Sequence, residues 1–109
     1  DNKVAIATAG GIEALVALAK SGTDGQKKQA AGALCDLARN ADNKVAIAKA
    51  GGIGPLLALL QRMPVSLPAQ AESAGALGQL AYKNTANQDA IAAHGGLPPL
   101  IQAFSWGVE

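Results

Sequence analysis

The chain has 109 residues, which is the length of one small domain. Half of the residues are hydrophobic, but tryptophan, tyrosine and phenylalanine occur once each, so small aliphatic side chains must form most of the core. The net charge is +1 and Lys27-Lys28 is the only adjacent basic pair, which disfavours a nucleic-acid partner because such binding needs clustered lysine and arginine. No apolar run approaches the ~20 residues of a membrane span, so no membrane partner is predicted.

The first predicted element is a short helix over residues 2–9, with Asp1 or Asn2 as its N-cap. The Gly10-Gly11 pair is predicted to end this helix, because glycine readily adopts the left-handed conformation of a helix C-cap. A second helix is predicted directly after the pair. Its apolar positions keep the i, i+3, i+4, i+7 spacing of one helix face, and they are Ile12, Leu15, Val16 and Ala19.

The third predicted helix is longer and covers residues 24–40. Thr23 and Gln26 have the spacing of a capping box at its start, in which each side chain bonds the other residue's backbone N–H. Ala30, Leu34 and Leu37 fall on one face of this helix, so we expect that face to be buried.

The same three elements then recur. Residues 42–48 repeat residues 1–7 letter for letter, and the Gly-Gly pairs at 10, 51 and 95 are spaced by 41 and then 44 residues. The block "AAGALCDLA" of the long helix returns as "SAGALGQLA", with a matching long helix predicted over residues 67–83 and Ser66 as a possible cap. Pro55 and Pro98-Pro99 lie near the starts of the later second helices, where a missing N–H costs little. Helices that cannot bury an apolar face alone are stabilised by stacking such units.

A unit of about 42 residues that reads N-x-x-A-I-x-x-x-G-G-I-x-x-L-L-x-L and then A-x-x-A-L-x-x-L-A resembles the armadillo repeat. HEAT repeats have a similar length but lack this Gly-Gly junction. The resemblance covers essentially the whole chain and implies an all-α, right-handed α-solenoid with three helices per repeat. We assign residues 1–41 to repeat one, residues 42–85 to repeat two, and residues 86–109 to the first two helices of a third repeat plus a short tail.

The resemblance also implies a function, since armadillo third helices line a concave groove that binds extended segments of partner proteins. Peptide-binding members such as importin-alpha carry a tryptophan and, four residues later, an asparagine on that helix. Here these positions are Gly32 and Asp36, then Gly75 and Gln79, so the lysine pockets are absent and we expect a mixed-charge or acidic partner rather than a lysine-rich one. The predicted groove residues are Lys28, Gly32, Asp36, Arg39, Asn40, Glu72, Gly75, Gln79, Tyr82 and Lys83.

No catalytic, cofactor or metal site is predicted. Cys35 and His94 are interpreted as a half-buried packing residue and a helix-end residue, and one cysteine with one histidine cannot form a structural zinc site. The Gly-Gly pairs lack the Lys-Ser/Thr of a phosphate-binding loop. The carboxylates that remain are interpreted as caps or first-turn charges, namely Asp24, Asp42 and Asp89. We therefore predict that the chain is not an enzyme.

Alternatives to a binding module stay open at this stage. The chain can be a purely structural segment of a longer armadillo array, or a designed or excised repeat fragment with no ligand of its own, since the first two units are nearly identical. A single cysteine fits a reducing compartment, so the prediction is intracellular, cytoplasmic or nuclear. We also expect self-association through uncapped ends, where the apolar side chains are Ile91, Leu97, Leu100, Ile101 and Phe104.

Overall fold

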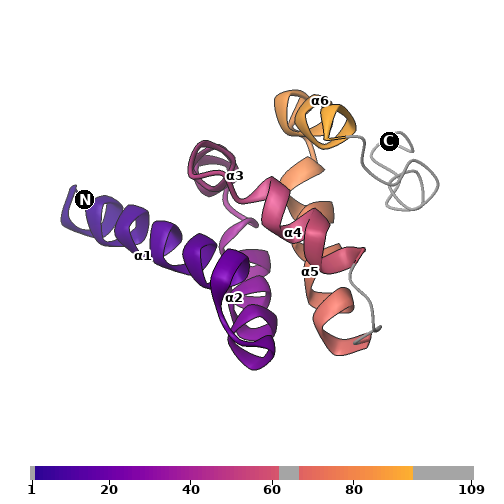
Figure 1. Cartoon of the computed structure of the whole chain (residues 1–109). Helices are drawn as coiled ribbons and strands as arrows, with labels where there is room; N and C mark the ends of the chain where they lie inside the picture. Colours follow the sequence, from indigo (N-terminus) through magenta and orange to yellow (C-terminus); the bar gives the residue numbers. More distant parts are fainter. Residues whose placement is uncertain (1, 62–66, 95–109) are drawn as a thin grey trace.

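The computed structural model describes residues 2–61 and 67–94, and every regular element among them is a helix (Figure 1). The all-α prediction is therefore confirmed. The six helices are α1 (Asn2–Ser21), α2 (Asp24–Leu37), α3 (Ala41–Lys49), α4 (Ile53–Leu60), α5 (Leu67–Ala81) and α6 (Thr85–Ala93). Ser66, Gly95-Gly96 and Pro98-Pro99, for which predictions were made, lie outside the described residues.

Helices α2 and α5, which correspond to the predicted third helix of each repeat, pack along each other and form the centre of the fold, with α1 against α2 and α4 against α5. Leu34 and Leu77, which occupy matched positions in these two helices, are both completely buried. The apolar faces predicted from the helical spacing also point inward. The buried members are Ile12, Val16, Ala19, Ala30 and Leu34, while Leu15 and Leu37 are half-buried against the same core. Helical periodicity therefore located the core correctly.

The expected exposure of Ile91 is wrong. Ile91 is 0% exposed and belongs to the same core cluster, because α6 packs against α3, α4 and α5 and turns this side chain inward. The other apolar residues named for the ends lie outside the described residues.

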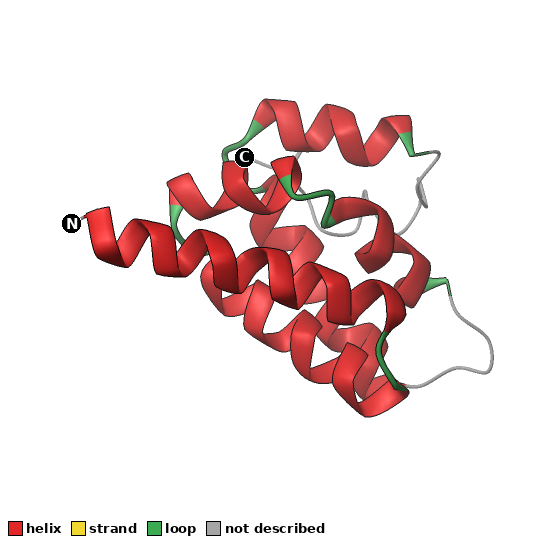
Figure 2. Ribbon diagram, turned by 60° about the vertical axis from the view of Figure 1, so that its left-hand side comes forward, coloured by secondary structure: helices red, strands yellow, loops and turns green. Residues whose placement is uncertain are grey.

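The predicted break at Gly10-Gly11 is also wrong. Helix α1 continues through both glycines to Ser21, as Figure 2 shows, so the first repeat has two helices rather than three. A Cβ atom added at either glycine would meet nothing within 4 Å. Nothing therefore hinders the atoms that a Gly-to-Ala replacement would add at these two positions, and continuing the helix keeps its backbone hydrogen bonds.

The second repeat has the three helices that were predicted. Helix α3 ends at Lys49, and Gly51 has a left-handed φ of 82°, a conformation that strongly favours glycine. The N–H of Gly52 bonds the carbonyl of Ile47 at 2.9 Å, and a Cβ at Gly52 would lie only 2.7 Å from Ile47 Cγ2. The turn into α4 thus needs glycine at both positions.

The helix starts are capped by side chains where the sequence offers them. The capping box of Thr23 and Gln26 is confirmed, with hydrogen bonds of 2.9 and 3.2 Å in the two directions. Asn40 caps α3 and Asn84 caps α6, each accepting from the backbone N–H three residues later. Asp24 and Asp42 lie in the first turns of α2 and α3, as expected of acidic residues near a positive helix end.

Candidate functional site

The predicted groove face lies on α2 and α5, and glycines bring these two helices close together. A Cβ added at Gly32 of α2 would lie 3.3 Å from the carboxyl group of Glu72 on α5. In the opposite direction, a Cβ at Gly75 of α5 would lie 3.2 Å from Cys35 Sγ on α2. The two positions that carry tryptophan in importin-like grooves are therefore contact points between the helices, where a large side chain would have to displace its neighbour.

A hollow of about 340 Å³ lies along α5. Three of its lining residues have almost no side chain, so the backbone of the helix is exposed to a partner. The lining residues are Ala74, Gly75, Gly78, Gln79 and Tyr82. Tyr82 follows the last turn of α5 and is 49% exposed, which makes it the largest side chain available on this face.

Two lysines place positive charge around Tyr82. Lys44 Nζ and Lys83 Nζ each lie 5.3 Å from the centre of its ring, within the range of a cation–π interaction. Lys44 also donates a hydrogen bond to the backbone carbonyl of Gln79. Its side chain is buried, and this burial lowers the pKa of the Lys44 ammonium. The end of α5 is consequently a cationic rim with an aromatic centre.

Lys83 and Asn40, both predicted as groove residues, do not occupy equivalent positions in their repeats. Lys83 has a left-handed φ of 53° and is the additional residue of the second repeat, inserted between α5 and the cap of α6. The structural counterpart of Asn40 is Asn84, because both accept a hydrogen bond as the N-cap of the next helix. The Asn40 side-chain oxygen is thus committed to its own helix rather than directed to a partner.

Three successive carbonyls at the end of α5 are bonded by side chains from neighbouring helices. Lys44 of α3 bonds the carbonyl of Gln79, while Asn87 and Gln88 of α6 bond those of Leu80 and Ala81, both at 2.9 Å. Asn43 makes the corresponding bond to Leu37 O at the end of α2, also at 2.9 Å. None of these residues was predicted from the sequence, although the asparagine that recurs at positions 43 and 87 indicates the shared role.

The other predicted groove residues give the rest of this face a mixed charge. Lys28 and Asp36 are exposed on α2, Arg39 is exposed just after it, and Glu72 is half-buried on α5. Opposite charges therefore alternate along the face, with the cations concentrated toward its Tyr82 end.

The remaining reactive side chains have structural surroundings. Cys35 is half-buried against the core, and burial, together with Asp36 and Glu72, raises the pKa of its thiol. A raised pKa is the opposite of what an activated nucleophile needs. His94 is the C-cap residue of α6 and is exposed, as predicted for a helix-end residue. Within residues 2–61 and 67–94, no group of three or more histidine, cysteine or acidic residues could hold a metal ion.

The family model of the armadillo/β-catenin-like repeat matches residues 1–39 and 40–82, well over half of the chain. The chain belongs to the armadillo-repeat family. Its helices also superpose on a crystal structure of an engineered protein from the Northeast Structural Genomics Consortium, with a TM-score of 0.71 and 34% sequence identity. The match covers 78% of this chain and 34% of that protein, so the chain spans about a third of its length. No curated protein matches the sequence significantly.

The family supports the coarse functional prediction. Armadillo repeats are scaffolds that bind proteins, and they are a non-catalytic type of repeat. None of the described helices is both long enough and apolar enough to cross a membrane.

Proposed function

We propose that this armadillo chain is a protein-binding module and that its α2–α5 face receives an extended segment of a partner protein. The observation that carries the proposal is the hollow along α5, which ends at the exposed ring of Tyr82. An exposed aromatic ring beside small residues is typical of a binding surface, because it offers apolar area that loses little conformational freedom on binding.

The charges around the hollow favour a partner with carboxylates. Lys83 lies beside Tyr82 and is exposed, as is Arg39 at the end of α2, whereas the buried Lys44 faces the Gln79 carbonyl. A lysine-rich segment would meet these cations without the tryptophan walls that hold lysine stems in importin-like grooves. The partner is therefore a mixed-charge or acidic segment, with Gln79 available to bond its backbone.

Fluorescence anisotropy with two labelled peptides of equal length, one rich in Glu and Tyr and one rich in Lys and Arg, tests this function. We expect the acidic peptide to bind with an affinity of about micromolar or weaker, since two helices offer little apolar area to offset the ordering of a peptide. Tyr82→Ala should weaken binding by about tenfold, while Tyr82→Phe retains the ring and most of the affinity.

Val45→Ala is the matched control, because Val45 is also an exposed apolar side chain but lies on α3, outside the hollow. It should leave peptide binding unchanged. Submicromolar binding of the lysine-rich peptide, lost in Gln79→Ala, would contradict the proposal and support an import-type groove.

A structural role without a ligand is the second candidate. It is favoured by the likeness to an engineered protein and by the identity of residues 1–7 with residues 42–48. In that case neither peptide binds at millimolar concentration, and Tyr82→Ala changes only the thermal stability. The same anisotropy titration therefore distinguishes the two candidates.

Three finer predictions accompany this proposal. The repeat boundaries at 1–41, 42–85 and 86–109 stay a prediction, as does an intracellular compartment. Self-association is also retained as a prediction, and its measurement is the molar mass by light scattering over a range of protein concentrations. A mass that stays at the monomer value up to millimolar protein would contradict it.

A further inference from the structure

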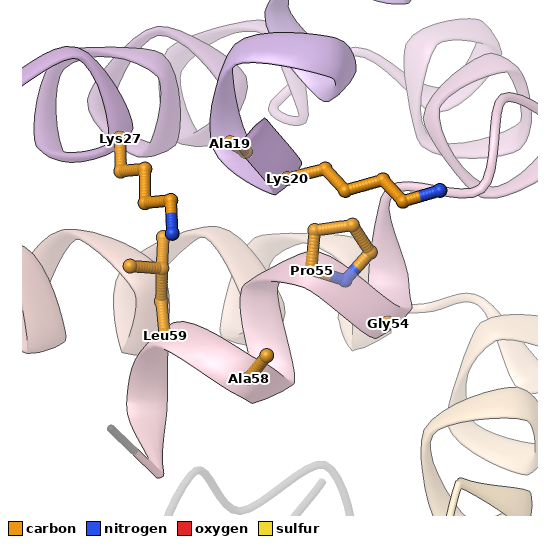
Figure 3. Close-up of a pocket in the computed structure, with 7 residues that line it drawn as sticks. All are labelled: Ala19, Lys20, Lys27, Gly54, Pro55, Ala58 and Leu59. Carbon is orange, nitrogen blue, oxygen red and sulfur yellow. The ribbon is translucent and has the colours of Figure 1, made fainter. Parts of the chain in front are cut away.

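A second hollow, of about 500 Å³, lies where α1, α2 and α4 meet. Figure 3 shows its floor and its rim. Ala19 of α1 and the α4 residues Pro55, Ala58 and Leu59 form an apolar floor, and Lys20 and Lys27 border it. None of the described residues that line this hollow also lines the one along α5, so we treat it as a separate surface.

The hollow exists because the residues that face it are small. Gly54, Pro55 and Ala58 leave the exposed side of α4 without long side chains, while the buried side of the same helix packs Leu56 and Leu57 into the core. Its volume falls within the range of about 300–1,000 Å³ that is usual for ligand sites. It is open to solvent rather than enclosed. This shape suits a side chain that projects from a partner chain better than a small molecule surrounded on all sides.

The rim of the hollow is cationic. In Figure 3, Lys20 extends over Pro55 from the end of α1, and Lys27 points toward Leu59 from the first half of α2. Among the described residues that line the hollow, none is acidic. Asp24 lies in the first turn of α2, one turn before Lys27, and lowers the positive potential without entering the site. Two lysines from different helices thus approach one apolar floor.

We propose that this hollow is a second protein-docking site, which binds a short acidic segment through one leucine-like side chain flanked by carboxylates. The aliphatic side chain rests on the floor formed by Ala19, Pro55 and Ala58. The flanking carboxylates pair with the ammonium groups of Lys20 and Lys27. Such a segment complements both the apolar area and the charge of the site, which neither a basic nor a wholly polar peptide does.

Three fluorescein-labelled peptides test the chemistry, built around Glu-Leu-Glu, Lys-Leu-Lys and Glu-Gly-Glu in the same neutral flanks. We expect the Glu-Leu-Glu peptide to bind with a dissociation constant of about 10 μM to 1 mM, and the other two at least about fivefold more weakly. Its affinity should fall further as salt is raised. Equal binding of the Lys-Leu-Lys or the Glu-Gly-Glu peptide, or no binding of any of them at millimolar concentration, would overturn the proposal.

A matched pair of variants tests the place. Ala58→Gln puts a longer neutral side chain into the floor, whereas Ala17→Gln makes the same change at the aligned position of α1, outside this hollow. Both alanines are exposed and helical, so both variants should fold, which thermal unfolding followed by circular dichroism checks. We expect at least fivefold weaker binding in Ala58→Gln and none of that loss in Ala17→Gln. An equal effect of the two variants would place the peptide elsewhere.

A second set of variants tests the charge. Lys20→Gln combined with Lys27→Gln should weaken the Glu-Leu-Glu peptide by about three- to tenfold, and Asp24→Asn should strengthen it slightly. Lys28 lies on the α2–α5 face, so Lys28→Gln is the control that tests whether the peptide binds there instead. If only Lys28→Gln weakened binding, the peptide would occupy that face and the second site would be disproved.

Discussion

The two Gly-Gly junctions within the described residues have the same sequence and opposite structures. At Gly10-Gly11 the helix runs straight through, so α1 extends to Ser21 as one element. At Gly51-Gly52 the chain turns between α3 and α4, and Gly51 adopts a left-handed conformation. The local sequence therefore permits a turn at both places, but the chain turns only at Gly51-Gly52.

The difference lies in what surrounds each pair. Gly52 packs against Ile47 of its own repeat and Val16 of the previous one, at distances that leave no room for a Cβ. Gly10 and Gly11 have no such neighbours within 4 Å. A glycine pair is thus a permissive hinge, and packing against an adjacent repeat decides whether the chain bends there. Substitutions in the core and at the two junctions test this comparison through the free energy of unfolding.

Truncating the matched leucines of α2 and α5 should give the largest loss of stability, and the loss should be equal in the two repeats. Leu34 and Leu77 are both fully buried, so either change to alanine should lower the free energy of unfolding by about 2–5 kcal/mol. Urea denaturation measures this. A much smaller loss in Leu34→Ala than in Leu77→Ala would show that the first repeat is packed less tightly as a whole, and not only at its junction.

Alanine at the second glycine of each pair should have opposite effects. Gly52→Ala would place its Cβ 2.7 Å from Ile47 Cγ2. The resulting shift should lower the free energy of unfolding by about 1–3 kcal/mol. Gly11→Ala lies within a continuous helix with open space around it, and should raise stability by about 0.5–1 kcal/mol.

Both variants can be compared in one thermal or urea unfolding series. If Gly11→Ala destabilised the protein, the first junction would be bent in solution as the second one is. The contrast between the two repeats would then be disproved.

Alanine at the first glycine of each pair tests the backbone rather than the packing. Gly51→Ala must hold a φ of 82° and should cost about 1–2 kcal/mol, because left-handed backbone is unfavourable for a residue with a Cβ. A Cβ there would meet nothing within 4 Å beyond its chain neighbours, so the cost arises within the local backbone and not from packing against other residues. Gly10→Ala should stabilise slightly. Equal melting temperatures for the two variants would contradict the left-handed turn.

The smallest effect concerns the buried Lys44, whose aligned residue in the third repeat is the neutral Gln88. Burial lowers the pKa of Lys44 in the folded state, so between the folded and unfolded pKa values the unfolded chain binds more protons. Stability should therefore rise with pH as Lys44 loses its proton. The comparison is unfolding of the parent and of Lys44→Gln at neutral pH and at a pH approaching the ordinary lysine pKa of 10.5, where only the parent should gain.

If the parent instead lost stability relative to Lys44→Gln over this range, the predicted pH dependence would be contradicted. Such a result would mean that the Gln79 carbonyl and the Tyr82 ring stabilise the charged ammonium by more than burial costs it.

Much of the fold follows from local patterns. Residues such as Ile12, Val16 and Leu34 recur with the helical period, and that period alone locates the buried face. The capping box at Thr23 is equally local. The continuous α1 was not predictable in this way, because the presence or absence of a turn depends on neighbours that are distant in the sequence.

At the candidate site, too, the features set by local sequence were predictable and those that depend on distant neighbours were not. The sequence correctly predicted Gln79 on the long helix, because Gln79 lies within the repeated block "SAGALGQLA". Tyr82 was also predicted in that helix, but α5 ends at Ala81, one residue before it. The sequence did not reveal that Lys44, from 35 residues earlier, reaches the carbonyl of Gln79 and lies over Tyr82. Nor did it show that Lys83 is the inserted residue, since an insertion of one residue can be placed at several points in an alignment.

The bonds at the end of α5 have a consequence for how such a surface changes over evolution. Lys44, Asn87 and Gln88 hold that helix by its backbone carbonyls, which every amino acid possesses. The side chains of α5 that face outward take no part in this attachment. Mutations can therefore replace them, and with them the preference for one partner over another, while the orientation of the helix is inherited unchanged.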